Sequence, residues 1–525
     1  MKFEFKNSIL ALILIFLITY LGYFTEQSEF AKIIGCYLPL FAIYAFTLKK
    51  IETKNAIYFF VATGILLRFI LLFSHPNLSD DLYRFIWDGR LLINGFNPFD
   101  HLPTYYIDNQ IAIEGITPTL FSKLNSPEYF TIYPPIAQLT FATAVGLFPN
   151  SIWGSALVMK LFLFFFEIGS IFLIIKLLRK FKMPPKNVLI YALNPLIIIE
   201  ICGNIHFEGA MIFFLLLAIW LMVSDLLSFQ NLVNLNATYL PESQEIQVQN
   251  RGQQSLTKSW RLSKSGMFSA IAFALSIASK LLPLMFLPFL IKRLGWKNSF
   301  QYFTIIGITL VLLFFPLING VFIENFGNSL NLYFQKFEFN ASLYYVARWI
   351  GFQTIGWNMI SVIGPALAIC TPILIFLMAG LEKFNFKPPA PKGERTVQNN
   401  RKSNHLPQSN SPLGAGGEHT TNTIGIWQTL PQKFLFAICI YLLFTTTVHP
   451  WYVALPVVLC SFTSFRFPVV WSALMVLTYI NYSYPIYQEN LWMVGIEYTI
   501  LGFFLIYEAI LAYKLREVRY LRTQN

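Results

Sequence analysis

The feature that most constrains this chain is a series of apolar runs, most of them close to the length of a bilayer-spanning helix. Such a helix needs about 20 mostly apolar residues, and windows that meet or nearly meet this length predict about twelve crossings. The windows lie at 8–24, 31–48, 56–73, 156–178, 188–204, 207–224, 298–318, 358–380, 434–447, 450–464, 468–482 and 491–513. With 55% hydrophobic and only 12% charged residues, the chain is predicted to be all-α and polytopic, with a single transmembrane domain over 1–525.

Two further apolar runs, 134–149 and 267–290, are interrupted by helix-breaking or charged residues. A Pro-Pro pair opens the first run, and Lys280 and Pro283 divide the second. Proline removes a main-chain donor, and a break inside the membrane is tolerated only where protein or water covers the backbone. We therefore expect half-helices: the first run should not cross, and the second should dip into the membrane and return.

The net charge of +12 is explained by orientation in a membrane, and no nucleic-acid partner is predicted. Basic residues gather in short connections at 179–186, 292–297 and 514–522, which the positive-inside rule places in the cytoplasm. The connection 74–131 is rich in acids instead. It is predicted to be an extracytoplasmic loop.

Two polar segments, 225–265 and 381–433, interrupt the apolar pattern. The second contains the run PPAPKGERTVQNNRKSNHLPQSNSPLGAGGEH. Because their low hydrophobicity cannot support a packed core, we expect two cytoplasmic linkers, the second of them disordered.

The polar block SDDLYRFIWDGRLLINGFNPF, from Ser79 to Phe99, directly follows an apolar run. An ionised carboxylate at the bilayer centre costs about 2.5–3.5 kcal/mol on insertion scales, so Asp80 and Asp81 are expected just outside the membrane. Ser79 is predicted to be the N-cap of a juxtamembrane amphipathic helix lying along the membrane surface, with both aspartates in its first turn. The plain alternative is that these carboxylates only cap and stabilise that helix.

Six segments, in this order along the chain, resemble the GT-C class of integral-membrane glycosyltransferases, especially prokaryotic mannosyltransferases that use polyprenyl-phosphate sugars. They are the Asp-Asp block ending in GFNPF, the Tyr-Pro-Pro run at 133–135, NPLIIIEICGNIHFEG at 194–209, ASKLLPLMFLP at 278–288, EFNASLYY at 338–345 and VHPWY at 448–452. The resemblance implies a GT-C-like helical fold in a prokaryotic inner membrane, with an extracytoplasmic active site. It also implies transfer of mannose or another hexose from a polyprenyl-phosphate donor to a glycan or lipid acceptor, with inversion.

By this resemblance, one of the two adjacent aspartates, Asp80 or Asp81, is the general base that accepts the proton of the acceptor hydroxyl. The sequence does not choose between them. The other carboxylate is expected to orient the acceptor or, as the alternative, to bind a divalent cation. No other cofactor is predicted, and neither a metal-ligand set nor an oligomeric state is assigned.

Departure of a lipid phosphate requires cationic or hydrogen-bonding groups aimed at it. The candidates for binding the donor phosphate or the substrate are Arg84, Asp88, His206, Glu208, Lys280, Arg348 and His449. The candidates for contacts with sugar or lipid are Trp87, Tyr133, Asn340, Tyr344, Tyr345, Trp451 and Tyr452. The competing interpretation is structural, because a lone histidine at a helix end is often an interface residue and a membrane lysine can extend to the headgroups.

Two acids inside apolar runs, Glu167 and Glu200, are interpreted as structural. An unpaired charge within a membrane is costly, so such residues face partners in the protein interior. We expect these two acids to pair with Lys160, Lys176 or Lys280.

Two other function classes share this helical pattern. A secondary transporter or lipid-glycan flippase would concentrate functional charge near the bilayer midplane, whereas the densest polar block here lies on the predicted outer loop. A lipid-linked glycan polymerase or ligase would differ in its donor more than in its architecture. A nucleotide-sugar donor is not expected, because the chain has no glycine-rich phosphate loop in a nucleotide-binding context.

Overall fold

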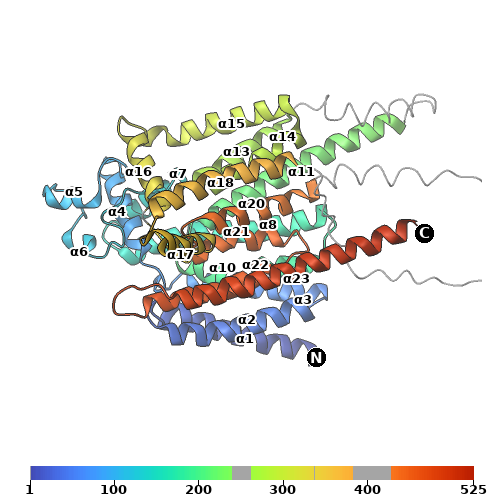
Figure 1. The fold of residues 1–525 in the computed structure, drawn as a ribbon, viewed down its shortest axis with the longest axis horizontal. Coiled ribbons are helices and arrows are strands. Elements are labelled where there is room, and N and C mark those ends of the chain that lie inside the picture. Colours follow the sequence, from blue (N-terminus) through green and yellow to red (C-terminus); the bar gives the residue numbers. More distant parts are fainter. Residues whose placement is uncertain (1, 239–261, 336, 382–426, 525) are drawn as a thin grey trace, which may run out of the picture.

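The computed structural model describes residues 2–238, 262–335, 337–381 and 427–524. Helices form nearly all of its regular structure, and most of them run along one direction in an elongated bundle (Figure 1). The exception among the described residues is an isolated bridge between Phe339 and Thr447. The all-α, polytopic fold predicted from the apolar windows is confirmed.

In the part of the chain that the structure describes, eight helices are long and apolar enough to cross a membrane. Each corresponds to one of the predicted windows. They are α1 (Lys2–Phe24), α2 (Phe30–Lys50), α3 (Lys54–Leu71), α8 (Ile152–Lys180), α11 (Glu208–Thr238), α15 (Trp296–Phe314, continued by η4, Phe315–Leu317), α18 (Ile360–Gly380) and α23 (Leu491–Gln524).

The other four windows form bent or short elements. Window 188–204 becomes two pieces bent by 47°, and at 1.5 Å per residue α20 spans about 22 Å, less than the roughly 30 Å of the hydrocarbon core. The count of about twelve full-length crossings is therefore too high: the described residues hold eight, or nine if the bent pair is one span. The elements are η1 (Pro185–Val188), α9 (Leu189–Ala192), α10 (Pro195–Ile197), η2 (Ile198–Gly203), α20 (Leu430–Phe444), η5 (Pro450–Val453), α21 (Ala454–Cys460), α22 (Phe467–Leu474) and η6 (Met475–Tyr482).

The bend in the broken span is stabilised by a buried ion pair. Arg68 of α3 donates to the freed carbonyl of Ala192 at 2.6 Å and to a carboxylate oxygen of Glu167 at 2.9 Å. The side chain of Asn194 caps the next piece by accepting the N–H of Ile197. Glu167 thus pairs with an arginine, and the prediction that it pairs with a lysine is wrong.

The run 267–290 is divided where predicted. Helix α13 (Lys264–Ser279) ends at Lys280, whose backbone is extended, and η3 (Leu282–Phe286) and α14 (Pro288–Leu294) follow. Lys292 in α14 donates to the main-chain oxygen of Gly380 at the last residue of α18. Figure 1 places α14 and the beginning of α13 toward the same end of the bundle, as expected for a segment that dips and returns.

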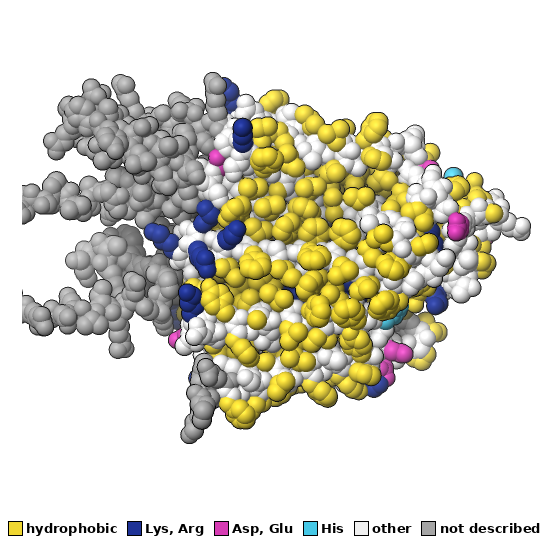
Figure 2. All heavy atoms as spheres, turned by 180° about the vertical axis from the view of Figure 1, so that it is seen from behind, with side chains coloured by type: hydrophobic (Ala, Val, Ile, Leu, Met, Phe, Trp, Pro, Cys, Tyr) yellow, Lys and Arg dark blue, Asp and Glu magenta, His cyan; other side chains and the backbone are white. Residues whose placement is uncertain are grey.

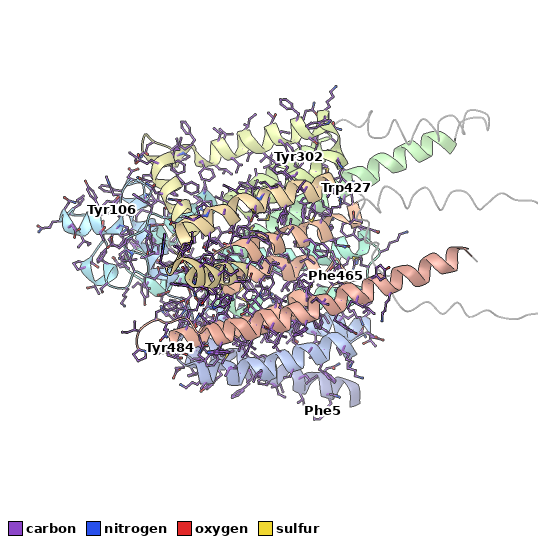
Figure 3. The ribbon with its side chains drawn as sticks, viewed as in Figure 1. Phe5, Tyr106, Tyr302, Trp427, Phe465 and Tyr484 are labelled. Atoms are coloured by element: carbon purple, nitrogen blue, oxygen red, sulfur yellow. The ribbon has the colours of Figure 1, made fainter. Side chains whose placement is uncertain are left out.

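A cap of short helices covers the opposite end of the bundle. It contains α4 (Asp81–Ile93), α5 (Pro103–Asp108), α6 (Pro118–Phe121), α7 (Pro135–Leu147), α16 (Phe322–Gln335) and α17 (Leu343–Ile355). Figure 3 shows Tyr106 of α5 in this cap, far from Trp427. The 13 residues of α7 are too few to span a bilayer, as predicted.

Helix α4 differs from its prediction in two respects. Its N-cap is Asp80 and not Ser79, whose hydroxyl accepts the N–H of Asp81 at 3.4 Å. Its polar face is not in water either, because the loop folds over it and buries Arg84 and Asp88 almost completely.

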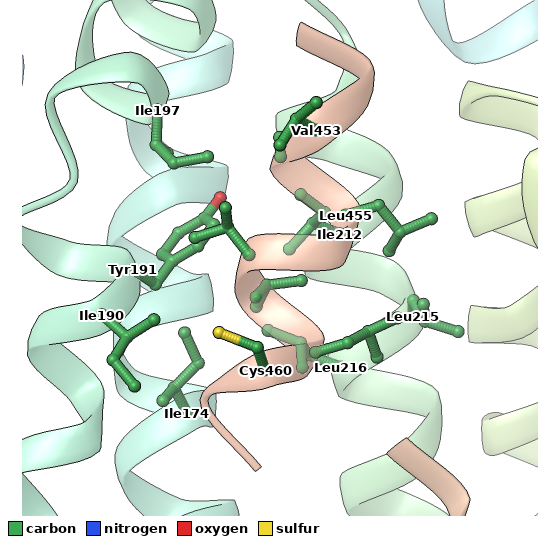
Figure 4. Close-up of a cluster of buried hydrophobic side chains, with 14 of the residues drawn as sticks. Ile174, Ile190, Tyr191, Ile197, Ile212, Leu215, Leu216, Val453, Leu455 and Cys460 are labelled. Carbon is green, nitrogen blue, oxygen red and sulfur yellow. The ribbon is translucent and has the colours of Figure 1, made fainter. Parts of the chain in front are cut away.

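The interior of the bundle is a continuous apolar core, part of which is shown in Figure 4. Isoleucine, leucine and valine side chains from α9, α10, α11 and α21 meet there around Tyr191 and Cys460. On the face in Figure 2, most Lys and Arg side chains lie near the end where the described chain stops at Thr238. The predicted linkers fall mainly on residues 239–261 and 382–426, which lie outside the described residues, while α11 continues through 225–238.

Candidate active site

The two adjacent aspartates lie at the start of α4, and a single amide bridges them. Nδ2 of Asn125 donates to Oδ1 of Asp80 at 3.0 Å and to Oδ1 of Asp81 at 2.7 Å. Oδ2 of Asp81 accepts from the hydroxyl of Tyr133 at 3.2 Å and faces Nε2 of His206 at 3.7 Å. Asp81 is thus held on both oxygens, whereas Asp80 remains exposed.

The two carboxylates differ electrostatically. The surrounding protein desolvates Asp80, and this effect together with the charge of Asp81 raises the pKa of Asp80. Desolvation also acts to raise the pKa of Asp81, but the nearby His206 and the hydrogen bond from Asn125 outweigh it and lower that pKa to about 2. Divergent pKa values of neighbouring acids indicate different chemical roles.

His206 is placed by an unusual stretch of backbone. The π-helical turn η2 ends at Gly203, and Ile205 then adopts a left-handed conformation with φ of 62° while fully buried. A β-branched residue in that conformation costs about 1–3 kcal/mol, and such strain clusters at functional sites. The buried imidazole lies with Nδ1 2.8 Å from the main-chain oxygen of Glu200.

Four aromatic rings form a column that leads away from Asp81. The rings of His206 and Trp451 stack at 3.7 Å, and those of Trp451 and His449 at 4.5 Å. Phe339 continues the column at 4.6 Å from His449, and Tyr452 meets His449 edge-on. Desolvation lowers the pKa of His449 to about 3; its contact with the donor phosphate stays a prediction.

Lys280 lies beside the ring of Tyr133. Its ammonium lies 5.0 Å from the ring centre of Tyr133 and 3.3 Å from Oε1 of Glu208. Tyr133 also bonds to Asp81, so Lys280 and Asp81 flank one side chain. The break after α13 allows this position, because the extended backbone of Lys280 directs the chain out of the helix.

Three predicted site residues of α4 have structural contacts instead. Arg84 pairs with Asp88 at 2.9 Å and donates to the main-chain oxygens of Ser126 and Tyr129. Asp88 also accepts from Gln138, and Trp87 is fully buried, where its ring packs against Tyr106 and Phe121. The polar contacts of Arg84 and Asp88 and the packing of Trp87 hold the loop on α4.

A second polar cluster lies beyond Phe339. Arg348 pairs with Glu338 and covers the ring of Tyr345 at 4.4 Å. The hydroxyl of Tyr344 donates to Glu338 at 2.5 Å. The amide of Asn340 donates to the buried Glu497 at 3.2 Å. These four predicted residues therefore lie together, whereas the contacts of Asp80 and Asp81 described above are with other residues.

Two apolar grooves adjoin these clusters. One of about 970 Å³ is lined by residues of α17, α20, α22 and α23, with Tyr345 and Arg348 among them. The other, of about 470 Å³, is lined by residues of η3, α14, α15, α18 and α20, among them Leu284, four residues after Lys280 in the sequence. Both grooves can accept hydrocarbon chains.

Asn125 and Glu338 contribute to these clusters and were missed in the sequence, since neither belongs to a periodic pattern or a charged run. Among the described residues, no group of three or more His, Cys, Asp or Glu side chains could hold a metal ion. The amide of Asn125 bonds to one oxygen of each aspartate; the binding of a divalent cation by the pair stays a prediction.

Comparison with known proteins gives one match. A family model described as alpha-(1->6)-mannopyranosyltransferase, N-terminal domain, matches residues 28–295, slightly more than half of the chain. No curated protein and no solved structure matches the chain. The matched region includes the aspartates, Tyr133, His206 and Lys280, whereas His449 and Trp451 lie outside it.

Proposed function

Because the chain belongs to the alpha-(1->6)-mannopyranosyltransferase family and is therefore a membrane glycosyltransferase, we propose that it transfers mannose from a polyprenyl-phosphate donor. The acceptor is a hydroxyl group of a lipid-linked glycan on the extracytoplasmic side. The observation that carries this proposal is the pair of unlike carboxylates, Asp80 and Asp81, in the cap at the end of the bundle opposite the basic connections.

In this proposal Asp80 is the general base. Apart from Asn125 and its own main-chain N–H, the Asp80 carboxylate has no hydrogen-bond partner among the described residues. Its raised pKa also makes it a better proton acceptor than Asp81. Asp81 remains ionised and, through Asn125 and Tyr133, fixes the geometry around the base.

The reaction is one displacement. The acceptor oxygen forms a bond to the anomeric carbon while its proton passes to the Asp80 carboxylate. The bond from the anomeric carbon to the phosphate oxygen breaks, and its electron pair leaves with the polyprenyl phosphate. Attack opposite the departing oxygen inverts the configuration.

Lys280 is assigned to the departing phosphate. Negative charge grows on that group as the bond breaks, and a fixed cation stabilises it most in a site shielded from water. The lipid chain then enters the smaller groove, whose lining includes Leu284, four residues after Lys280 in the sequence. This arrangement places the sugar on the side of Tyr133 and Asp81.

The larger groove is assigned to the lipid of the acceptor. Arg348 lies in its lining, and its guanidinium has one ion-pair partner, Glu338, among the described residues. Arginine binds phosphate through several N–H groups at once. An acceptor carried on a lipid phosphate therefore matches both the apolar lining and the charge.

The test uses purified protein in nanodiscs with radiolabelled polyprenyl-phosphate mannose and lipid-linked or soluble glycans. We expect labelled mannose on the lipid-linked glycan, with the inverted anomeric configuration by NMR of the product. Transfer from a nucleotide sugar instead would overturn the donor assignment. Movement of the labelled donor across vesicles without transfer would show a flippase.

A further inference from the structure

Glu200 lies against His206 and contacts no lysine, contrary to the sequence prediction. This acid is buried in the π-helical turn η2 of the broken span. Its Oε1 accepts from the hydroxyl of Tyr479 at 2.5 Å, and its Oε2 accepts from the amide of Asn204 at 3.1 Å. Oε2 also lies 3.4 Å from Nδ1 of His206.

Both nitrogens of His206 face groups that only accept hydrogen bonds. Nδ1 lies 2.8 Å from the main-chain oxygen of Glu200, which fixes a proton on Nδ1. Nε2 has no hydrogen-bond partner among the described residues and lies 3.7 Å from Oδ2 of Asp81. A lone pair on Nε2 would point at a carboxylate, so the geometry favours a proton on both nitrogens.

The ring of His206 cannot turn freely away from this position. One face is covered by the indole of Trp451 at 3.7 Å. The backbone before it contains the left-handed, buried Ile205. Three independent features, the π-helical turn, the strained residue and the stacked ring, therefore hold one orientation of the imidazole.

We propose that Glu200 is a positioning residue, whose oxygens hold the Nδ1–H of His206 so that the Nε2–H is directed at Asp81. Glu200, His206 and Asp81 form a row of side chains in contact. This row keeps Asp81 ionised and holds it beside Asp80, the proposed base. The consequence for catalysis rests on the proposed function, because it needs Asp80 to be the base. The row itself can be tested without turnover.

Other charged and titratable groups also face this row and are left unchanged in the test. They come from each element packed around it: Tyr37 of α2, Asp81 of α4, Glu208 of α11, Lys280 after α13, His449 before η5, and Tyr479 and Tyr482 of η6. The substitution E200Q removes one charge and keeps an oxygen for Tyr479. Its effect on His206 therefore reports the loss of the carboxylate, which removes both the charge and the oxygen that accepts from Asn204.

The direct experiment is NMR of histidine-labelled protein in nanodiscs, in wild type, E200Q and E497Q. The chain has six histidines, and H206Q identifies the signal of His206. We expect Nδ1 to carry a proton throughout, and E200Q to lose the Nε2 proton at a lower pH than wild type. E497Q removes a buried acid that contacts Asn340 and Trp471 instead, so its His206 should titrate as in wild type.

A bare Nδ1 in wild type, or the same titration of His206 in E200Q and wild type, would overturn the proposal. If E200Q does not fold, the protonation state of Nδ1 in wild-type His206 still tests the proposal. In the transfer assay, the alkaline limb of the pH profile of kcat should move to lower pH in E200Q. E200D should restore part of this shift, and E497Q should have the same profile as wild type. Absence of transfer in the wild type would reject the proposed function while the NMR result stands.

Discussion

The assignment of Asp80 as base makes the substitutions D80N and D81N the sharpest comparison. Removing a general base costs a factor of about 10²–10⁴ in turnover, equal to about 2.7–5.4 kcal/mol. D80N should therefore lower kcat by at least about a hundredfold. The exposed D108N variant, from the same loop, is the matched control and should keep wild-type turnover.

D81N should act mainly through the pH dependence. Both carboxylates bond to one amide at 3.0 and 2.7 Å, so their charges are about 5 Å apart and interact by about 0.8 kcal/mol in a water-like dielectric. This corresponds to roughly 0.6 pH unit. Activity is lost as pH falls through the raised pKa of Asp80, and without the charge of Asp81 this acid limb should move to lower pH.

The assay is a pH series of initial rates of mannose transfer for the three variants and wild type, with folding checked by size-exclusion chromatography. If D80N kept more than about a tenth of wild-type turnover while D81N fell a hundredfold, the roles would be reversed. If the acid limb of the pH–rate profile moved to higher pH in D81N, Asp81 would not raise the pKa of Asp80.

Four other predictions follow from the site and the fold. K280Q should lower kcat by about a hundredfold because a departing phosphate loses its cation, with K280R retaining most activity in the same transfer assay. R348Q should raise KM for a lipid-linked acceptor at least severalfold while KM for the donor stays constant. An equal rise in both KM values would contradict the assignment of Arg348 to the acceptor alone. R68M should destabilise the protein by about 3–5 kcal/mol, since Glu167 becomes an unpaired buried charge; thermal unfolding in detergent measures this, and an unchanged midpoint would contradict it. A cysteine at Asn109 should react with an impermeant reagent added outside intact cells, and protection would reverse the proposed orientation.

The helical class could be predicted because apolar runs near 20 residues have few alternatives in a bilayer. Helix ends were less predictable: the apolar window 450–464 continues past Cys460, where α21 ends. The N-cap of α4 was displaced by one residue because Ser79 and Asp80 are both good caps. Local sequence did not distinguish them.

The aspartate pair could be located in the sequence because its polarity contrasts with the preceding apolar run. Its partners could not: Asn125 lies more than forty residues away from either aspartate. Arg84 and Asp88 were chosen for their charge, but the covering loop that contacts them is a tertiary feature. Glu200 was assigned a lysine partner because sequence spacing does not show which helix faces another.

The stacked rings of His206 and Trp451 join two distant parts of the polypeptide. Translation must reach Trp451 before its indole can stack on the imidazole of His206. A product that ends earlier therefore lacks the ring that covers His206.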